Sequence, residues 1–244
     1  MGLLQACSIG TNLVANRFES SEVKGKSASE GTFVPFTTTN HIEMISDIQS
    51  NPPDTTHNKV YKSAVMGGGL KAGLFEKVDV SIDAYFNSPA MVGAKYQWLG
   101  DNERNATNGN FSLSTKVAVG YQGKSYSADK TSSNTTNSTT ASLTHKTADF
   151  SVIAGKRLGE NFLVTLSPFW QVSNVSGTIN QTSRGLDYVY QGHGGQKGLS
   201  LGMMVIGKSN VVKLDNSLTQ VYWNNSAHNL TSYNIGLSFG VKFQ

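Results

Sequence analysis

The chain ends at residues 232–244 with the sequence SYNIGLSFGVKFQ, and this stretch decides the fold class. Apolar residues occupy every second position, and the positions between them are small or polar. Successive side chains of a β-strand point to opposite faces, so the pattern predicts a strand with one apolar and one polar face. A length of roughly ten residues with aromatic side chains near both ends is typical of a strand that crosses an outer membrane.

The same alternation recurs upstream of this strand. The strands it predicts lie at residues 40–48, 61–74, 78–86, 90–99, 111–122, 142–158, 162–172, 199–205 and 211–223. With residues 232–244 they make ten, and single-chain bacterial barrels usually have an even number of strands. We therefore predict an all-β fold, an antiparallel up-and-down transmembrane β-barrel of ten strands. Barrels of eight or twelve strands are the alternatives.

Composition agrees with a barrel and excludes other classes. Hydrophobic residues make up 38% of the chain, and no apolar run approaches the roughly 18 residues that a membrane helix needs. Half of every barrel strand faces the lumen, so a barrel needs no such run. The formal charge is +4 and the basic residues are scattered, so we expect no nucleic-acid partner.

The connections predict which end of the barrel faces outward. Short turns at 74–77, 158–161 and 207–210 alternate with long polar connections at 51–58, 128–141, 177–196 and 224–229, although 87–89 and 100–109 break the rule. Outer-membrane barrels have short periplasmic turns and long outer loops, so we expect both termini in the periplasm. Aromatic residues at the strand ends should form two membrane girdles. They are Phe86, Tyr121, Tyr222 and Tyr233 at the outer end and Trp98, Phe111, Phe162 and Phe243 at the inner end.

The last strand resembles the C-terminal strand by which bacterial outer-membrane β-barrel proteins are recognised for insertion. In most of that family the final residue is aromatic, whereas here Gln244 follows Phe243. The resemblance implies a place in the Gram-negative cell envelope, in the bacterial outer membrane. The implied partners are outer-membrane lipid, lipopolysaccharide and, through residues 232–244, the barrel-assembly machinery. The oligomeric state is left open.

Residues 1–31 form a polar segment ahead of the barrel, to which we assign residues 32–244. The sequence Leu4-Gln5-Ala6-Cys7 resembles the lipobox of bacterial lipoproteins, but only three residues precede it. A lipid anchor at Cys7 and a free thiol are both left open, and the single cysteine excludes an internal disulfide. For residues 8–31 we favour disorder over a periplasmic tether or a place in the lumen.

Charged residues at inward positions predict the character of the lumen. They are Glu43, Asp47, Lys71, Asp79, Asp83, Lys95, Lys116 and Asp149. Charges in a low-dielectric interior must be paired or hydrated, and ten strands enclose little more than side chains. We predict a filled or narrow lumen and a structural or surface-binding role. The alternative is a porin-like diffusion channel for small solutes.

A second alternative is an enzyme, because the resembled family includes ten-stranded proteases and lipid-A-modifying barrels. His57, His193 and His228 fall in or beside predicted outer loops, and Asp54 precedes His57 closely. A general base needs an orienting partner and a nucleophile, and no Asp-Asp or His-x-Ser pattern supplies them. We therefore predict that the protein is not a hydrolase or other enzyme. We also predict no cofactor and no metal site, because no metal-ligand spacing appears.

Overall fold

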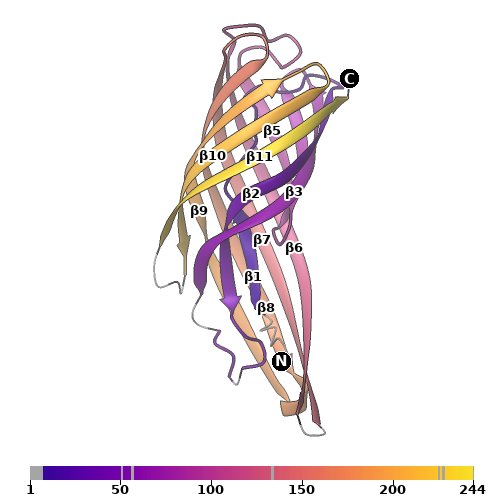
Figure 1. Ribbon diagram of the computed structural model, residues 1–244, viewed down its shortest axis with the longest axis vertical. Coiled ribbons are helices and arrows are strands. Elements are labelled where there is room, and N and C mark those ends of the chain that lie inside the picture. The colour runs from indigo at the N-terminus through magenta and orange to yellow at the C-terminus, as the bar shows by residue number, and fades with distance from the viewer. Residues whose placement is uncertain are drawn as a thin grey trace.

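The computed structural model describes residues 8–50, 52–55, 58–132, 135–224, 226 and 229–243, and only the backbone at 129–132, 135–137 and 183. Cys7, His57 and His228 lie outside the described residues. Ten strands form a closed antiparallel barrel, which confirms the predicted fold class and strand number (Figure 1). They are β2 (Ser29–Ile45), β3 (Lys59–Phe75), β4 (Val78–Tyr85), β5 (Ala90–Leu99), β6 (Phe111–Ser132), β7 (Thr135–Arg157), β8 (Phe162–Gln181), β9 (Leu186–Ile206), β10 (Asn210–Trp223) and β11 (Leu230–Phe243). A short 3-10 turn, η1 (Thr182–Arg184), joins β8 to β9.

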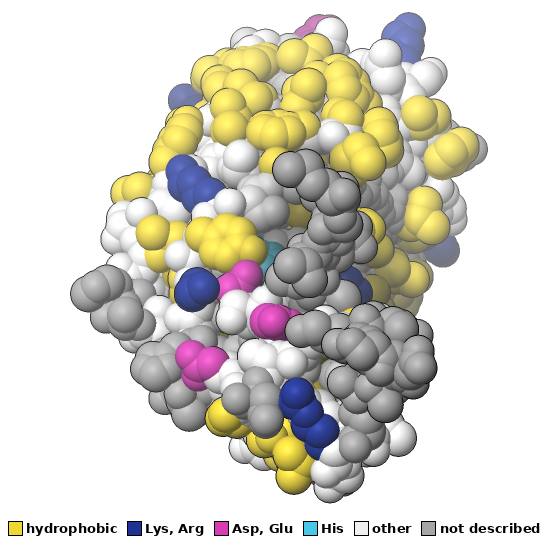
Figure 2. Space-filling model, turned by 60° about the horizontal axis from the view of Figure 1, so that its bottom comes forward, with side chains coloured by type: hydrophobic (Ala, Val, Ile, Leu, Met, Phe, Trp, Pro, Cys, Tyr) yellow, Lys and Arg dark blue, Asp and Glu magenta, His cyan; other side chains and the backbone are white. Residues whose placement is uncertain are grey.

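Large apolar side chains cover the outside of the barrel wall. Figure 2 shows them crowded in the upper part of the view, with charged side chains on the end that faces the viewer. Of the predicted girdle residues, Phe86, Trp98, Phe111, Tyr121, Tyr233 and Phe243 are exposed, while Phe162 and Tyr222 are half-buried. An apolar belt on the outer face is what a wall in contact with lipid requires. Within the described parts of the chain, no helix is long and apolar enough to cross a membrane.

Two hairpins project beyond the wall at the bottom of Figure 1. The ladder between β6 and β7 continues to the pair Ser132 and Thr135, and that between β8 and β9 to Gln181 and Leu186. The predicted loops at 128–141 and 177–196 are thus wrong, because most of these residues lie in strands. Polar side chains such as Ser and Thr can lie on one face of a strand when the other face is packed.

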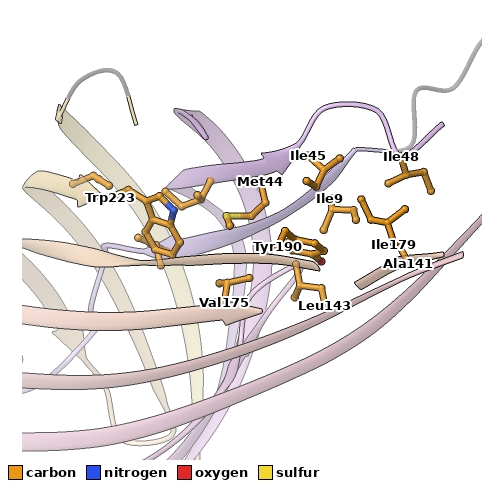
Figure 3. Close-up of a cluster of buried hydrophobic side chains, with 13 residues drawn as sticks. Ile9, Met44, Ile45, Ile48, Ala141, Leu143, Val175, Ile179, Tyr190 and Trp223 are labelled. Atoms are coloured by element: carbon orange, nitrogen blue, oxygen red, sulfur yellow. The ribbon is translucent and has the colours of Figure 1, made fainter. Parts of the chain in front are cut away.

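An apolar cluster fills the inside of the projecting sheet. It joins a short strand, β1 (Ile9–Val14), and the end of β2 to β7, β8, β9 and β10. Its buried members are Ile9, Leu13, Ile42, Met44, Ile45, Ile48, Ala141, Leu143, Val175, Ile179, Tyr190, Val221 and Trp223. Figure 3 shows the side chains of β1 and β2 meeting those of the projecting strands. The projecting sheet therefore has a hydrophobic core of its own.

β1 pairs with the second half of β2, at the end of the barrel that carries the projecting hairpins. It occupies the part of the β2 edge with which β11 does not pair. The ladder between β2 and β11 runs from Ser29 and Phe243 to Thr37 and Gly236. Beyond that point β2 pairs with β1 instead, beginning at Thr39 and Val14. The seam between β2 and β11 is closed there by side chains, for example by the Thr38 hydroxyl, which accepts from the Ile235 N–H at 2.8 Å.

The described ends of the chain lie at opposite ends of the barrel. Ile9 pairs with Ile45 at the end that carries the projecting hairpins, whereas Phe243 pairs with Ser29 at the end with the short turns. The sequence had predicted both termini on one side. The structure differs for the described residues because residues 15–28 run through the barrel and join β1 to β2. β2 begins at Ser29, ahead of the predicted boundary at residue 32.

Candidate functional site: the occupied lumen

Residues 15–28, which we call the lumenal segment, are almost all buried. They include both charged and apolar side chains, among them Phe18, Glu19, Glu22, Val23 and Lys24. The preferred prediction of disorder is therefore wrong, and the alternative of a place in the lumen is the one observed. A polar segment can lie inside a closed wall only if its charges and backbone groups are paired.

Glu19 is the centre of one ion-pair cluster. Its carboxylate lies 2.9 Å from the Lys71 ammonium, 2.7 Å from that of Lys116 and 3.9 Å from that of Lys95. Lys116 also pairs with Asp83 at 3.1 Å, and Lys95 with Asp79 at 3.3 Å. The structure thus brings together the lumen-facing residues predicted on β3, β4, β5 and β6. One carboxylate from the lumenal segment completes their pairing.

Two further pairs fix the segment to β7. The Arg157 guanidinium donates through Nε and Nη2 to the Glu22 carboxylate at 2.7–3.0 Å. Arg17 donates to Asp149 at 2.6 Å, and its guanidinium lies 3.7 Å from the centre of the Phe169 ring. Charge-assisted bidentate pairs of the first kind are strong and geometrically specific. They hold the segment in one register along the wall.

Lys24 anchors the segment at the end with the short turns. Its ammonium pairs with Glu30 and, at 2.6 Å, with Glu103. Lys213 also pairs with Glu30, and Lys242 pairs with Glu103 at 2.8 Å. The Glu103 N–H donates to the Val23 carbonyl at 2.8 Å. The long connection at residues 100–109, which broke the loop rule, therefore folds over this mouth of the barrel and holds the segment in place.

Side chains of the wall also satisfy several backbone groups of the lumenal segment. Wall groups accept from its N–H groups and donate to its carbonyls, as an adjacent strand would. Asp215 accepts from Phe18, Gln97 from Val23 and Asp79 from Lys24, while Lys71 donates to Phe18 and Lys95 to Ser20 and Glu22.

Where the lumenal segment turns against β3, the wall residue that it meets is a glycine, which has no side chain. A Cβ atom on Gly73 of β3 would lie 1.9 Å from the Gly25 carbonyl oxygen. Gly25 itself has a φ of +83°, a conformation that other residues rarely adopt. The two glycines let the segment turn against the wall before β2 begins.

The lumenal segment occupies much of the lumen between the described strands. One cavity of about 50 Å³ lies between the segment and the wall, beside Asn16, Arg17 and His145. A water molecule takes up roughly 30 Å³ in the liquid, so this cavity has room for one or two. A second hollow, of about 560 Å³, lies at the mouth covered by residues 100–109 and outside the lumenal segment.

The remaining predicted site residues lie elsewhere. Glu43 is near the outer end of β2, 3.5 Å from the Lys59 ammonium. Asp47 is not in the wall, because β2 ends at Ile45 and the Asp47 carboxylate accepts from the Gln49 N–H in the following turn. His193 lies in β9 and is exposed, with its N–H donating to Asn224. Among the described residues, no group of His, Cys, Asp or Glu has an arrangement that suits a metal ion.

Sequence reasoning missed the residues that fill the lumen. They are Arg17, Glu19, Glu22 and Lys24 of the segment and Glu30, Arg157, Lys213 and Asp215 of the wall. One signal was present, because the only charged residues predicted to face inward on β3, β5 and β6 are lysines, and buried lysines require acidic partners.

Comparison with known proteins gave one informative result. No family model matches the chain. No curated protein matches it. Among solved structures, the outer-membrane protease OmpT from Escherichia coli is similar, with a TM-score of 0.43 and 9% sequence identity over 98% of this chain and 97% of that chain. A likeness this distant carries no argument about activity.

Two conclusions follow for the predictions. The prediction that the protein is not an enzyme is corrected to an open question, since the solved barrel named above is a protease, although the likeness assigns no activity to this chain. Assignment to the class holds, because the closed antiparallel wall and its apolar outer face are observed in the chain itself. The chain is therefore a closed ten-stranded antiparallel β-barrel with the apolar outer face of a transmembrane barrel.

Proposed function

We propose that this protein is an outer-membrane barrel that is closed at rest and acts at the cell surface through its projecting hairpins. The observation that carries the proposal is the lumenal segment, whose charges pair with the wall along the length of the lumen. Removing either partner of a buried pair is costly, so the segment is held firmly in place. A barrel filled in this way offers solutes no continuous water path.

The projecting sheet supports the surface role. β6 to β9 extend past the wall as a four-stranded sheet, and the apolar cluster fixes this sheet to β1 and β2. Long outer connections are usual in this class, but they need no hydrophobic core to shield a barrel. A rigid sheet held above the membrane is suited to binding another molecule, because a preorganised surface loses little entropy on binding.

Planar-bilayer conductance tests the closed lumen. We expect no steady conductance from the wild-type protein and stepwise conductance from Glu19→Lys, which adds a cation among Lys71, Lys95 and Lys116. Glu43→Lys is the matched control, since it reverses a charge outside the lumenal segment and should stay closed. Discrete steps in the wild-type protein would support the diffusion-channel alternative and refute the closed barrel.

Proteolysis of intact cells tests the surface role. A protease added outside should cut the projecting hairpins, and cell lysis should expose no further sites in them. If the hairpins are cut only after lysis, they face the periplasm and the surface role is wrong.

A further inference from the structure

The hollow of about 560 Å³ at the mouth of the barrel is lined mainly by charged and polar residues. They come from the connection at 100–109, from the turns after β7 and β9 and from the end of β11. They are Glu103, Arg104, Ala106, Arg157, Glu160, Asn161, Ile206, Gly207, Lys208, Ser209 and Lys242. Small-molecule sites usually have volumes of about 300–1,000 Å³, so the hollow is large enough for a ligand of several residues or sugars.

Most charges deep in the hollow are already paired. Arg157 uses Nε and Nη2 on Glu22 and Nη1 on the Glu160 carbonyl. Glu103 accepts from Lys24 at one oxygen and pairs with Lys242 at the other. These residues are engaged with one another and have little left with which to bind a ligand.

Three charged side chains at the rim remain available. Arg104 has one hydrogen bond, from Nη1 to the Lys26 carbonyl at 3.2 Å, and its guanidinium has other donors to offer. Lys208 and Glu160 are exposed, and within the part of the chain that the structure describes neither side chain forms an ion pair. The rim thus presents two cations and one carboxylate.

We propose that this hollow binds an acidic peptide that carries a free ammonium group and an excess of carboxylates. Arg104 and Lys208 would bind carboxylates and Glu160 the ammonium, with the Asn161 amide and the Ser209 hydroxyl as neutral partners. The proposal rests on the orientation in the proposed function, in which the short turns face the periplasm.

Titration calorimetry on the detergent-solubilised protein tests the site. The probe is the tripeptide L-Ala-D-Glu-meso-diaminopimelate, which carries both charges and is net negative. We expect Arg104→Glu with Lys208→Glu to weaken binding about tenfold or more, because two attractive pairs become repulsive. Lys77→Glu is the matched control, since this exposed lysine lies in the β3–β4 turn at the same end and does not line the hollow. It should bind as the wild type does.

A third variant tests the ammonium contact. Glu160→Gln should weaken binding of the tripeptide but not that of glutarate, a dicarboxylate without an ammonium, which loses only a repulsive neighbour. Equal affinity of the wild type and the Arg104→Glu/Lys208→Glu variant would overturn the site. Inorganic phosphate binding as tightly as the tripeptide would overturn the peptide chemistry. Neither result depends on the conductance measurement, so either one would leave the proposal of a closed lumen unaffected.

Discussion

Glu22 and Arg157 show how strongly a single residue of the lumenal segment is tied to the wall. The exposed fraction is 0% for the Glu22 side chain and 4% for that of Arg157. Almost no solvent reaches the pair, so each charge has to be matched by the other. A neutral replacement of one partner leaves the other buried without its counter-ion.

Glu22→Gln should therefore lower the free energy of unfolding by about 3–5 kcal/mol, the usual cost of breaking a buried pair from one side. Unfolding by urea in detergent micelles measures the change. The double variant Glu22→Gln with Arg157→Gln should recover part of the loss, because no buried charge then remains unpaired. Glu160→Gln is the control, because its side chain is exposed and should cost little. A single variant as stable as wild type would show that water reaches Arg157.

The wall residues of this network were predictable one by one, whereas their partners were not. Lys71, Lys95 and Lys116 stand at alternate positions in strands, so the period of two assigns them a face. Glu19 and Glu22 lie in a segment without a period, NRFESSEVKGKSASEG, where no pattern assigns a direction. Their place follows only from the closure of the wall around them.

β1 is the element that connects the lumenal segment to the projecting sheet. Its residues Ile9 and Leu13 are fully buried in the apolar cluster, against side chains of β2 and the projecting strands. This short strand could not be predicted from the sequence, because it has only six residues and its partner on β2 is distant along the chain. The strands β6 to β9 are longer than predicted. Ser and Thr are frequent in their extensions, so the alternation of apolar and polar residues that marks a strand is hard to see there.

Leu13→Ala should lower the free energy of unfolding by about 2–5 kcal/mol, because it leaves a cavity in a packed cluster. It should also raise proteolysis of the projecting hairpins, since they lose a contact that orders them. Val189→Ala is the control, because that side chain lies on β9 and is 65% exposed. Equal sensitivity of the two variants would mean that the cluster does not fix the sheet to β1.

At the scale of the whole molecule, the path of the chain sets its topology in the membrane. The pattern of strands and turns predicted the wall correctly, but strand counting placed both termini on one side. The lumenal segment reverses this for the described residues, since it carries the chain from the end with the projecting hairpins to the end with the short turns.

Thiol labelling of intact cells tests this topology. In a Cys7→Ser background, Ser8→Cys should react with a membrane-impermeant maleimide added outside, whereas Ser209→Cys should react only after lysis. Both residues are exposed, so access depends on the side of the membrane. Labelling of neither before lysis would restore the original prediction of two periplasmic ends, and labelling of Ser209→Cys alone would invert the barrel.

The shared edge of β2 has a consequence for how such a barrel is made. Two residues beyond the last β2–β11 pair, the same register would place Asn234 opposite Thr39, yet Thr39 pairs with Val14. β2 is thus partly engaged by β1, which precedes it, while β11, which completes the ring, is the last of the described strands to be synthesised. Residues 100–109 then cover one mouth of the ring and hold the lumenal segment there. We therefore expect the segment to be in place before β2 and β11 close the barrel.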